Sequence, residues 1–340
     1  MQSKSRLVPL AGVLASTALL LGACASQPEP VPTNAGPNAP ELAELTIGYN
    51  VPFDPTFLPD LAAFECLEQE KGVRASVREV TGAPASIASL VAGALDITLS
   101  TLGSGLNAIA AEQDLVAVVP SASAPYFMLM APGDVEDWED LKGLTFGSTA
   151  PSDSSYYTTV LLLGAHGIEP EDVQWVTVQG SAARAQAMVA GKIDAGQVTV
   201  SEMLEVESQS DKRAFAAVGE DFPDLIFNAY WVKRSFLEQN PNTVRAFVEC
   251  VMSEHAAAYD EEQFMAKAAE LLPGGMDQAT LDRAYETLIG MRIWDPEESA
   301  WNEESGDRTV QTMVDYGALP GFIPFEDWAE TSIVDAVRAG

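Results

Sequence analysis

The chain has 340 residues, and 47% of them are apolar, so it can bury one large hydrophobic core or two smaller ones. Its 50 acidic residues far outnumber its 18 basic residues, which gives a formal net charge of −32. A surface this acidic repels phosphate backbones, so the composition argues against nucleic-acid binding.

The N-terminus has the pattern of an export signal. Lys4 and Arg6 form a short basic head, and residues 7–21 form an apolar run that is shorter than the roughly 20 residues a membrane span needs. We therefore expect a signal peptide over residues 1–23. The Leu-Gly-Ala sequence directly before Cys24 resembles the bacterial lipobox, which implies cleavage before Cys24 and a lipid on its thiol. The alternative is an ordinary signal peptide with an incidental cysteine.

Residues 24–44 are predicted to form a flexible tether. They contain five prolines among mostly polar residues, a composition that cannot bury a core and stays extended. Together with a lipid on Cys24, the tether would hold a folded body at the membrane surface, in the cell envelope and outside the cytoplasm.

Strands and helices alternate at the start of the body. Apolar strands are predicted at residues 45–51, 73–80 and 95–99, and helices at 55–72 and 84–92. This order is typical of a parallel sheet with helical crossovers.

A short internal repeat indicates two similar halves. Residues 90–97 (LVAGALDI) recur as residues 188–195 (MVAGKIDA), and in both copies a helix ends at a glycine before an aspartate leads into a strand. Two α/β halves in one exported chain predict a bilobal binding protein. We place the first lobe at residues 45–124 and 233–340, and the second lobe at residues 125–232.

The second lobe and the C-terminal region continue this pattern. Strands are predicted at residues 126–131 and 144–147, and a helix at 152–166. Residues 226–232 are predicted as the return crossing to the first lobe. From Pro241 onward apolar residues recur with a helical period, so we expect helices that pack back on the first lobe.

Cys66 and Cys250 are the cysteines of the body. An oxidising compartment permits a disulfide between them. Two buried free thiols are nevertheless the interpretation that we prefer from the sequence, because free cysteine is often buried as a small apolar residue.

The sequence lacks the signatures of common enzymes. It contains no Gly-x-Ser-x-Gly, Gly-x-Gly-x-x-Gly, Walker or Cys-x-x-Cys motif. His166 and His255, its two histidines, have no nucleophile or metal-ligand partner near them in the sequence, and the acidic run 295–307 lacks the spacing of an EF-hand loop. We therefore expect no enzyme, no metal site and no bound cofactor.

Polar residues follow the carboxyl ends of the predicted strands, where open α/β sheets bind ligands. Hydroxyls, amides and free N–H groups at helix starts would form a hydrogen-bonding cradle there. The predicted ligand-binding residues are Tyr49, Asn50, Phe53, Thr81, Gly82, Ser100, Thr101, Ser123, Ser152, Asp153, Ser154, Ser155, Tyr156, Gln197 and Thr199.

Five segments resemble one family of ABC-importer substrate-binding proteins, whose members carry nitrate, sulfonates, taurine and thiamine-pyrimidine precursors. The segments are residues 141–147 (LKGLTFG), 167–173 (GIEPEDV), 179–184 (QGSAAR), 190–195 (AGKIDA) and 315–319 (DYGAL). The resemblance implies a bilobal type II periplasmic-binding-protein fold, with two open, mostly parallel sheets, flanking helices and two crossover strands. It also implies a small-molecule solute and an ABC permease and ATPase as partners, and we expect a monomer. The family has a cytosolic enzyme branch that depends on a cysteine cluster, which this chain lacks.

The strand-end loops contain no lysine and no arginine, and this absence indicates which charge the solute carries. Arg184 is nearest, and the resemblance places it in the first turns of a helix. A strongly hydrated dianion usually meets arginine or many convergent amides. We therefore expect a neutral or singly charged heterocycle, such as a pyrimidine-like vitamin precursor, with aromatic stacking surfaces that include Tyr126 and Tyr157. An alkanesulfonate held by a helix N-terminus is the alternative.

Two other functions remain open for the same chain. It could be the solute receptor of a secondary transporter, or a ligand-sensing surface lipoprotein. Neighbouring genes for an ATPase and a permease, or for a secondary carrier, would separate the importer from the first of these.

Overall fold

The computed structural model describes residues 38–50, 54–149, 154–272 and 276–339. The expected signal peptide, the lipidation site Cys24 and most of the expected tether lie outside these residues. Within the described ranges, no helix has both the length and the apolar character that a membrane crossing requires.

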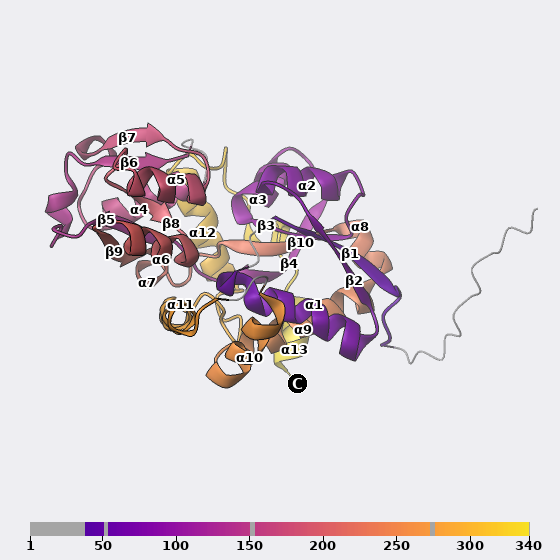
Figure 1. Ribbon diagram of the computed structural model, residues 1–340. Coiled ribbons are helices and arrows are strands. Elements are labelled where there is room, and N and C mark those ends of the chain that lie inside the picture. The colour runs from indigo at the N-terminus through magenta and orange to yellow at the C-terminus, as the bar shows by residue number, and fades with distance from the viewer. Residues whose placement is uncertain (1–37, 51–53, 150–153, 273–275, 340) are drawn as a thin grey trace, which may run out of the picture. The chain divides into compact units, whose positions relative to one another are not determined.

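Sheet A contains five strands in the order β2-β1-β3-β10-β4. β10 runs antiparallel to both of its neighbours, whereas β1 is parallel to β2 and β3. Figure 1 shows β10, drawn in the salmon colour of a late segment, among indigo and purple strands from the start of the chain. The strands are β1 (Glu44–Tyr49), β2 (Arg74–Glu79), β3 (Ile97–Thr101), β4 (Leu115–Ala122) and β10 (Asn228–Lys233).

Sheet B repeats this arrangement in the order β7-β6-β8-β5-β9. Its antiparallel strand is β5, which pairs with β8 and β9. Both sheets are therefore mixed, with one antiparallel strand in each, which agrees with the expected mostly parallel sheets. The strands are β5 (Met128–Pro132), β6 (Thr145–Ser148), β7 (Gln174–Thr177), β8 (Ala195–Val198) and β9 (Lys212–Ala217).

The chain passes twice between the sheets. Residues 123–127 lead from β4 to β5, and residues 222–227 lead from α7 (Val218–Asp221) to β10. The second lobe was expected to end at residue 232, whereas β10, which begins at Asn228, is hydrogen-bonded between β3 and β4 of sheet A. Each sheet thus receives its antiparallel strand directly after a crossing.

Helices connect and cover the strands. Those between strands of sheet A are α1, which follows the 3₁₀ turn η1, then α2 and α3; those between strands of sheet B are α4, α5 and α6. Gly72 ends α1 with a φ of 69°, the left-handed conformation that glycine adopts most readily. The bounds are η1 (Pro55–Phe57), α1 (Leu58–Lys71), α2 (Ala83–Val91), α3 (Leu102–Ala110), α4 (Ser154–Ala165), α5 (Ser181–Val189) and α6 (Val200–Gln209), with 3₁₀ turns η2 (Trp138–Leu141) and η3 (Pro170–Asp172).

The C-terminal region is helical, as expected, but it does not pack only on the first half. α9 contacts α1 and β4, whereas α11 contacts α6 and α7 of the other half. An ion pair between Arg283 of α11 and Glu207 of α6 adds to that contact. The bounds are α8 (Arg234–Gln239), α9 (Pro241–Ala257), α10 (Glu261–Leu271), α11 (Gln278–Met291), α12 (Glu303–Asp315), η4 (Phe325–Asp327) and α13 (Ser332–Arg338).

The internal repeat has the same hydrogen bonds in both halves. Asp96 accepts from the Thr46 N–H at 2.8 Å and donates its own N–H to the Thr46 carbonyl at 2.9 Å. Asp194 makes the same two bonds with Thr145, at 2.9 Å and 2.8 Å. Each aspartate therefore fixes the start of one strand against its parallel neighbour, which explains why the motif occurs in both halves.

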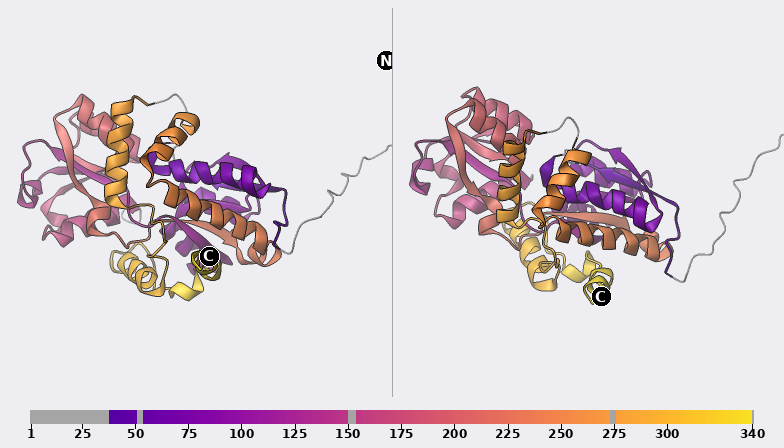
Figure 2. Two further views of the ribbon diagram at one scale, coloured as in Figure 1. Left: turned by 90° about the horizontal axis from the view of Figure 1, so that it is seen from below. Right: turned by 60° about the horizontal axis from the view of Figure 1, so that its bottom comes forward.

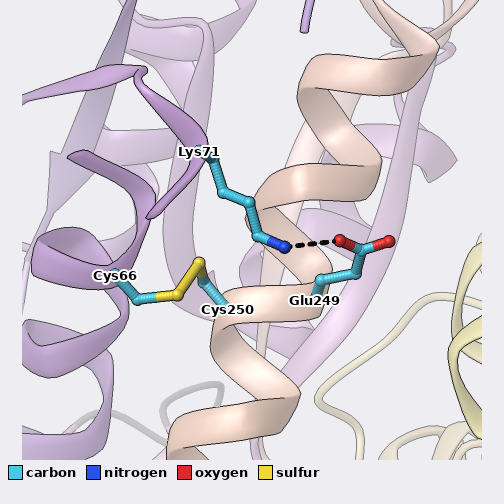
Figure 3. Close-up of a disulfide and its surroundings, with 4 residues drawn as sticks. All are labelled: Cys66, Lys71, Glu249 and Cys250. Carbon is cyan, nitrogen blue, oxygen red and sulfur yellow. Dashed lines mark hydrogen bonds and ion pairs between the residues drawn. A yellow bond between two sulfur atoms is a disulfide. The ribbon is translucent and has the colours of Figure 1, made fainter. Parts of the chain in front are cut away.

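A disulfide joins Cys66 of α1 to Cys250 of α9 (Figure 3). The preference for two free thiols is therefore wrong. The two helices lie side by side in both views of Figure 2, which brings cysteines that are 184 positions apart in sequence within bonding distance. An ion pair between Lys71 and Glu249, at 2.8 Å, lies beside the disulfide.

Candidate functional site

The segment after β1 and the helix after β8 are in direct contact. The Ser201 hydroxyl, in the first turn of α6, donates to Asp54 Oδ2 at 3.2 Å. Asp54 also caps η1, because its Oδ1 accepts from the Thr56 N–H at 2.9 Å. The carboxyl ends of β1 in sheet A and β8 in sheet B therefore come together at Asp54, at the strand ends where α/β sheets bind ligands.

Two predicted residues of sheet A hold its loops together. With its amide oriented to satisfy both groups, Asn50 donates to the Leu99 carbonyl and accepts from the Ala83 N–H, each at 3.1 Å. The Ser100 hydroxyl donates to the Ala83 carbonyl at 3.2 Å. These side chains connect the ends of β1 and β3 to the start of α2, so they support the frame of the site.

The other predicted residues of sheet A divide between caps and core. Thr101 caps α3 by accepting from the Ser104 N–H at 3.4 Å. Thr81 and Gly82 are exposed at the start of α2, where Gly82 adopts a φ of 89°. Tyr49 is fully buried, so its ring belongs to the core rather than to an open stacking surface.

Ser123, at the start of the crossing from β4 to β5, belongs to a buried polar network. It donates to Glu298 Oε2 at 3.3 Å, and Glu298 Oε1 lies 2.6 Å from His255 Nδ1. Asp60 accepts from the Tyr230 hydroxyl at 2.7 Å, and burial raises its pKa to about 6. We call this set the Asp60 network; its members are Asp60, Ser121, Ser123, Tyr230, His255 and Glu298.

Gln197 and Ser148 present buried polar atoms at the strand ends of sheet B. Gln197 is fully buried at the end of β8, and its Oε1 accepts from the Thr158 hydroxyl at 2.8 Å. Its Nε2 and the Ser148 Oγ at the end of β6 have no hydrogen-bond partner among the described residues. Arg184 is buried in α5 and donates its Nε to the Gln197 carbonyl at 2.7 Å, which supports the end of β8.

Thr199 begins α6 and orients a carboxylate. Its hydroxyl donates to Glu202 Oε2, and its N–H donates to the Ser181 hydroxyl at 3.0 Å. Ser181 also donates to Glu202 Oε2, at 3.1 Å. The predicted residue Thr199 thus places Glu202 in the first turn of α6.

The serine-rich start of α4 is described only in part. The Ser155 and Thr149 hydroxyls share a hydrogen bond of 2.7 Å, and the Ser154 carbonyl accepts from Thr158. The Tyr156 ring lies 4.8 Å from the ring of Trp175 on β7. The predicted residues Phe53, Ser152 and Asp153 lie outside the described residues.

Aromatic rings pack where the two crossings meet. The Tyr126 ring lies 5.2 Å from Phe57 and 5.1 Å from Phe227, and Phe127 lies 5.4 Å from Phe227. Asn228, at the start of β10, donates its Nδ2 to the Tyr126 hydroxyl at 3.2 Å. Its Oδ1 has no donor among the described residues.

The electrostatic environment of this junction is acidic. Burial raises the pKa of Asp54 to about 6, the charge of Glu202 adds to the rise, and hydrogen bonds from Thr56 and Ser201 oppose it. Burial likewise raises the pKa of Tyr126, and the charges of Asp54 and Glu202 contribute. These shared effects place Asp54, Glu202 and Tyr126 in one neighbourhood.

The sequence predicted Gln197 and Thr199 as ligand-binding residues, but it did not predict Asp54, Ser148, Glu202 and Asn228, the other polar residues of this region. Asp54 and Glu202 had a recognisable signal, because each stands in a helix-capping pattern next to a strand end. No sequence signal marks Asn228, because its place in the site depends on β10 joining sheet A, which a local pattern does not indicate. Ser148, Gln197 and Asn228 are among the buried residues that carry a polar atom without a hydrogen-bond partner in the described part of the chain, and all three stand at an end of a strand.

The histidines have structural partners. His166 Nε2 lies 2.7 Å from Asp221 Oδ2, and its ring stacks on Trp138 at 3.6 Å. His255 belongs to the Asp60 network. Within the described ranges, no three residues among His, Cys, Asp and Glu gather in a way that could hold a metal ion.

Solved structures share this fold at low sequence identity. The ligand-binding component of an ABC-type import system from Staphylococcus aureus is 13% identical and has a TM-score of 0.69 over 87% of this chain and 99% of that one. The periplasmic aliphatic sulphonate binding protein SsuA from Escherichia coli is 18% identical, with a TM-score of 0.68 over 86% and 99%. The periplasmic nitrate-binding protein NrtA from Synechocystis is 12% identical, with a TM-score of 0.66 over 88% and 89%. The fold is that of the periplasmic binding proteins.

The family is settled by sequence rather than by fold. No curated protein matches the chain. The NMT1/THI5-like family model matches residues 69–262, which is more than half of the chain and includes parts of both sheets. The protein belongs to the NMT1/THI5-like family.

Proposed function

We propose that this protein is a solute-binding protein that delivers a small organic molecule to an ABC importer. The observation that carries the proposal is that Ser148, Gln197 and Asn228, each at an end of a strand, carry buried polar atoms without a hydrogen-bond partner among the described residues. A few polar groups and an aromatic surface are what a small-molecule site needs. The names of the similar structures support the importer, because they include an ABC-type import component.

The proposal also includes how the protein is anchored to the membrane. A lipid on Cys24 and a tether over residues 24–44 would keep the body outside the cytoplasm and close to the permease. The lobes would be residues 45–124 with 233–340, and residues 125–232, acting as a monomer. Such a protein hands over its solute unchanged, and it has no catalytic role.

A planar, heterocyclic solute is our first candidate for the ligand. The partly exposed Tyr156 ring supports it, because flat ligands bind well beside aromatic side chains. A sulfonate is the second candidate, because the Escherichia coli protein of similar fold is named as a sulphonate binder.

A thermal-shift panel on the mature protein without its lipid would test this function. It should contain pyrimidine-like heterocycles, alkanesulfonates and nitrate. We expect at least one organic solute to raise the melting temperature by several degrees through mass action, by roughly 2–4 °C per kcal/mol of binding energy.

The site itself is tested with Asn228→Ala, which removes an unpartnered acceptor. This variant should weaken the response to the active solute by about tenfold in Kd. The control Gln311→Ala changes an exposed amide that bonds only Asp315 on α12, so its response should match the wild type. Equal responses in both variants would refute the site.

A further inference from the structure

Asp54 carries a negative charge at the junction of the two sheets without a cation beside it. Its carboxylate accepts from two neutral donors, the Thr56 N–H and the Ser201 hydroxyl. Within the described part of the chain, it forms no ion pair. A carboxylate withdrawn from water and left without a counter-charge is costly, and burial and Glu202 together raise its pKa to about 6. A positive charge bound here would relieve that cost.

Glu202 is a second carboxylate in the same neighbourhood. It follows Ser201 in the first turn of α6, and its Oε2 accepts from the Thr199 and Ser181 hydroxyls. These bonds fix the side chain, but both donors are neutral, and Glu202 has no ion pair among the residues the structure describes. An anion at this place would meet two negative charges.

Asn228 supplies an independent sign of a ligand at the same place. Its Oδ1 is buried, with the residue only 1% exposed, and has no donor among the described residues. Its Nδ2 holds the Tyr126 hydroxyl, whose pKa rises with the charges of Asp54 and Glu202. An unpaired amide oxygen accepts hydrogen bonds and cannot donate them.

We propose that the solute is an organic cation, whose protonated nitrogen binds Asp54 and Glu202. The inference rests on the proposed function, because it assumes that the solute binds where the crossings meet. Gln197 Nε2, an unpaired donor, would bind an acceptor atom of the same solute. Nitrate and alkanesulfonates are disfavoured, since the two carboxylates repel them.

The test compares three probes of similar size and different charge: benzylamine, benzyl alcohol and benzenesulfonate. Each is added at about 10 mM to the mature protein near pH 7.5, and the melting temperature is measured. We expect benzylamine to raise it by about 2–4 °C and benzenesulfonate to leave it unchanged.

Charge-removing variants connect the effect to the site. Asp54→Asn and Glu202→Gln should each reduce the affinity for benzylamine by about tenfold or more, measured by calorimetry. Glu205→Gln is the matched control, because it removes the same charge from an exposed position on the same helix. Because Asp54→Asn and Glu202→Gln are independent variants, the affinity can still be compared with the wild type if one of them folds poorly.

The outcomes separate the two proposals. Stabilisation by benzylamine that both site variants lose and Glu205→Gln keeps supports the cation. If benzenesulfonate or benzyl alcohol stabilises the protein and benzylamine does not, the organic-cation proposal is overturned, whereas the solute-binding function is still supported. If no probe shifts the melting temperature, the organic-cation proposal is also overturned. Solute binding is then tested separately by the thermal-shift panel of heterocycles, alkanesulfonates and nitrate.

Discussion

Asp60 is the residue whose burial has the clearest effect on stability. Its carboxyl is fully buried, and burial raises its pKa from 3.8 to about 6. The folded protein therefore holds this proton at pH values where the unfolded chain has released it, so the free energy of unfolding falls as the pH rises from about 4 to about 6. The full effect of Asp60 is about 3 kcal/mol. His255 acts in the same direction, because its raised pKa gives stability that is lost as the pH rises through the folded value.

Asp60→Asn tests this account. An amide stays neutral at every pH, so the variant should lose about 3 kcal/mol of the decline in the free energy of unfolding between about pH 4 and pH 6, and the part due to Asp54, whose pKa is also raised to about 6, should remain. Denaturant unfolding at several pH values measures it. Asp134→Asn, at an exposed position, is the control and should keep the wild-type slope. Equal slopes in Asp60→Asn and wild type would contradict the assignment.

Among the elements, α1 and α9 are joined most strongly, by the disulfide between Cys66 and Cys250. The bond spans 184 positions in sequence, and closing a loop of this length stabilises a protein by about 5 kcal/mol in the chain-entropy model. The Lys71–Glu249 ion pair beside it is partly exposed, so it contributes less than about 1 kcal/mol.

Replacing both cysteines by serine should therefore lower the free energy of unfolding by about 2–5 kcal/mol. Glu249→Gln, which removes only the neighbouring ion pair, should change it by less than about 1 kcal/mol. Urea unfolding of both variants, without reductant, gives the comparison. A double serine variant as stable as the wild type would show that the disulfide does not form in the native protein.

The elements also show what the sequence can predict. The α/β alternation and the repeat were predictable, because apolar periodicity and the Gly-to-Asp pattern are local. The place of β10 was not, because a strand pattern does not say which sheet the strand joins. The disulfide and the unpartnered Asn228 both depend on that long-range arrangement. Thr101 and Thr199 lie at strand ends as expected, yet the Thr101 hydroxyl caps α3 and the Thr199 hydroxyl binds Glu202, so both side chains have partners within the protein.

At the scale of the whole molecule, residues 123–127 and 222–227 carry the backbone from one sheet to the other, and α11 also contacts the second half. Two short connections allow hinge bending, which is how two-lobed binding proteins close around a ligand. A solute that raises the melting temperature should therefore also reduce the radius of gyration in X-ray scattering. An unchanged radius with a solute whose binding calorimetry has established would contradict the hinge.

The late position of β10 in the sequence has a consequence for the proposed export. A protein that crosses the membrane unfolded emerges from its N-terminus, and sheet B, whose strands run from residue 128 to 217, is complete once residue 217 is outside. Sheet A begins 84 residues earlier, at Glu44, but β3 and β4 are held together only by β10. In the proposed export, sheet A would therefore keep a gap between β3 and β4 until residue 233 has crossed the membrane. Sheet B, whose strands begin later in the sequence, is therefore complete before sheet A.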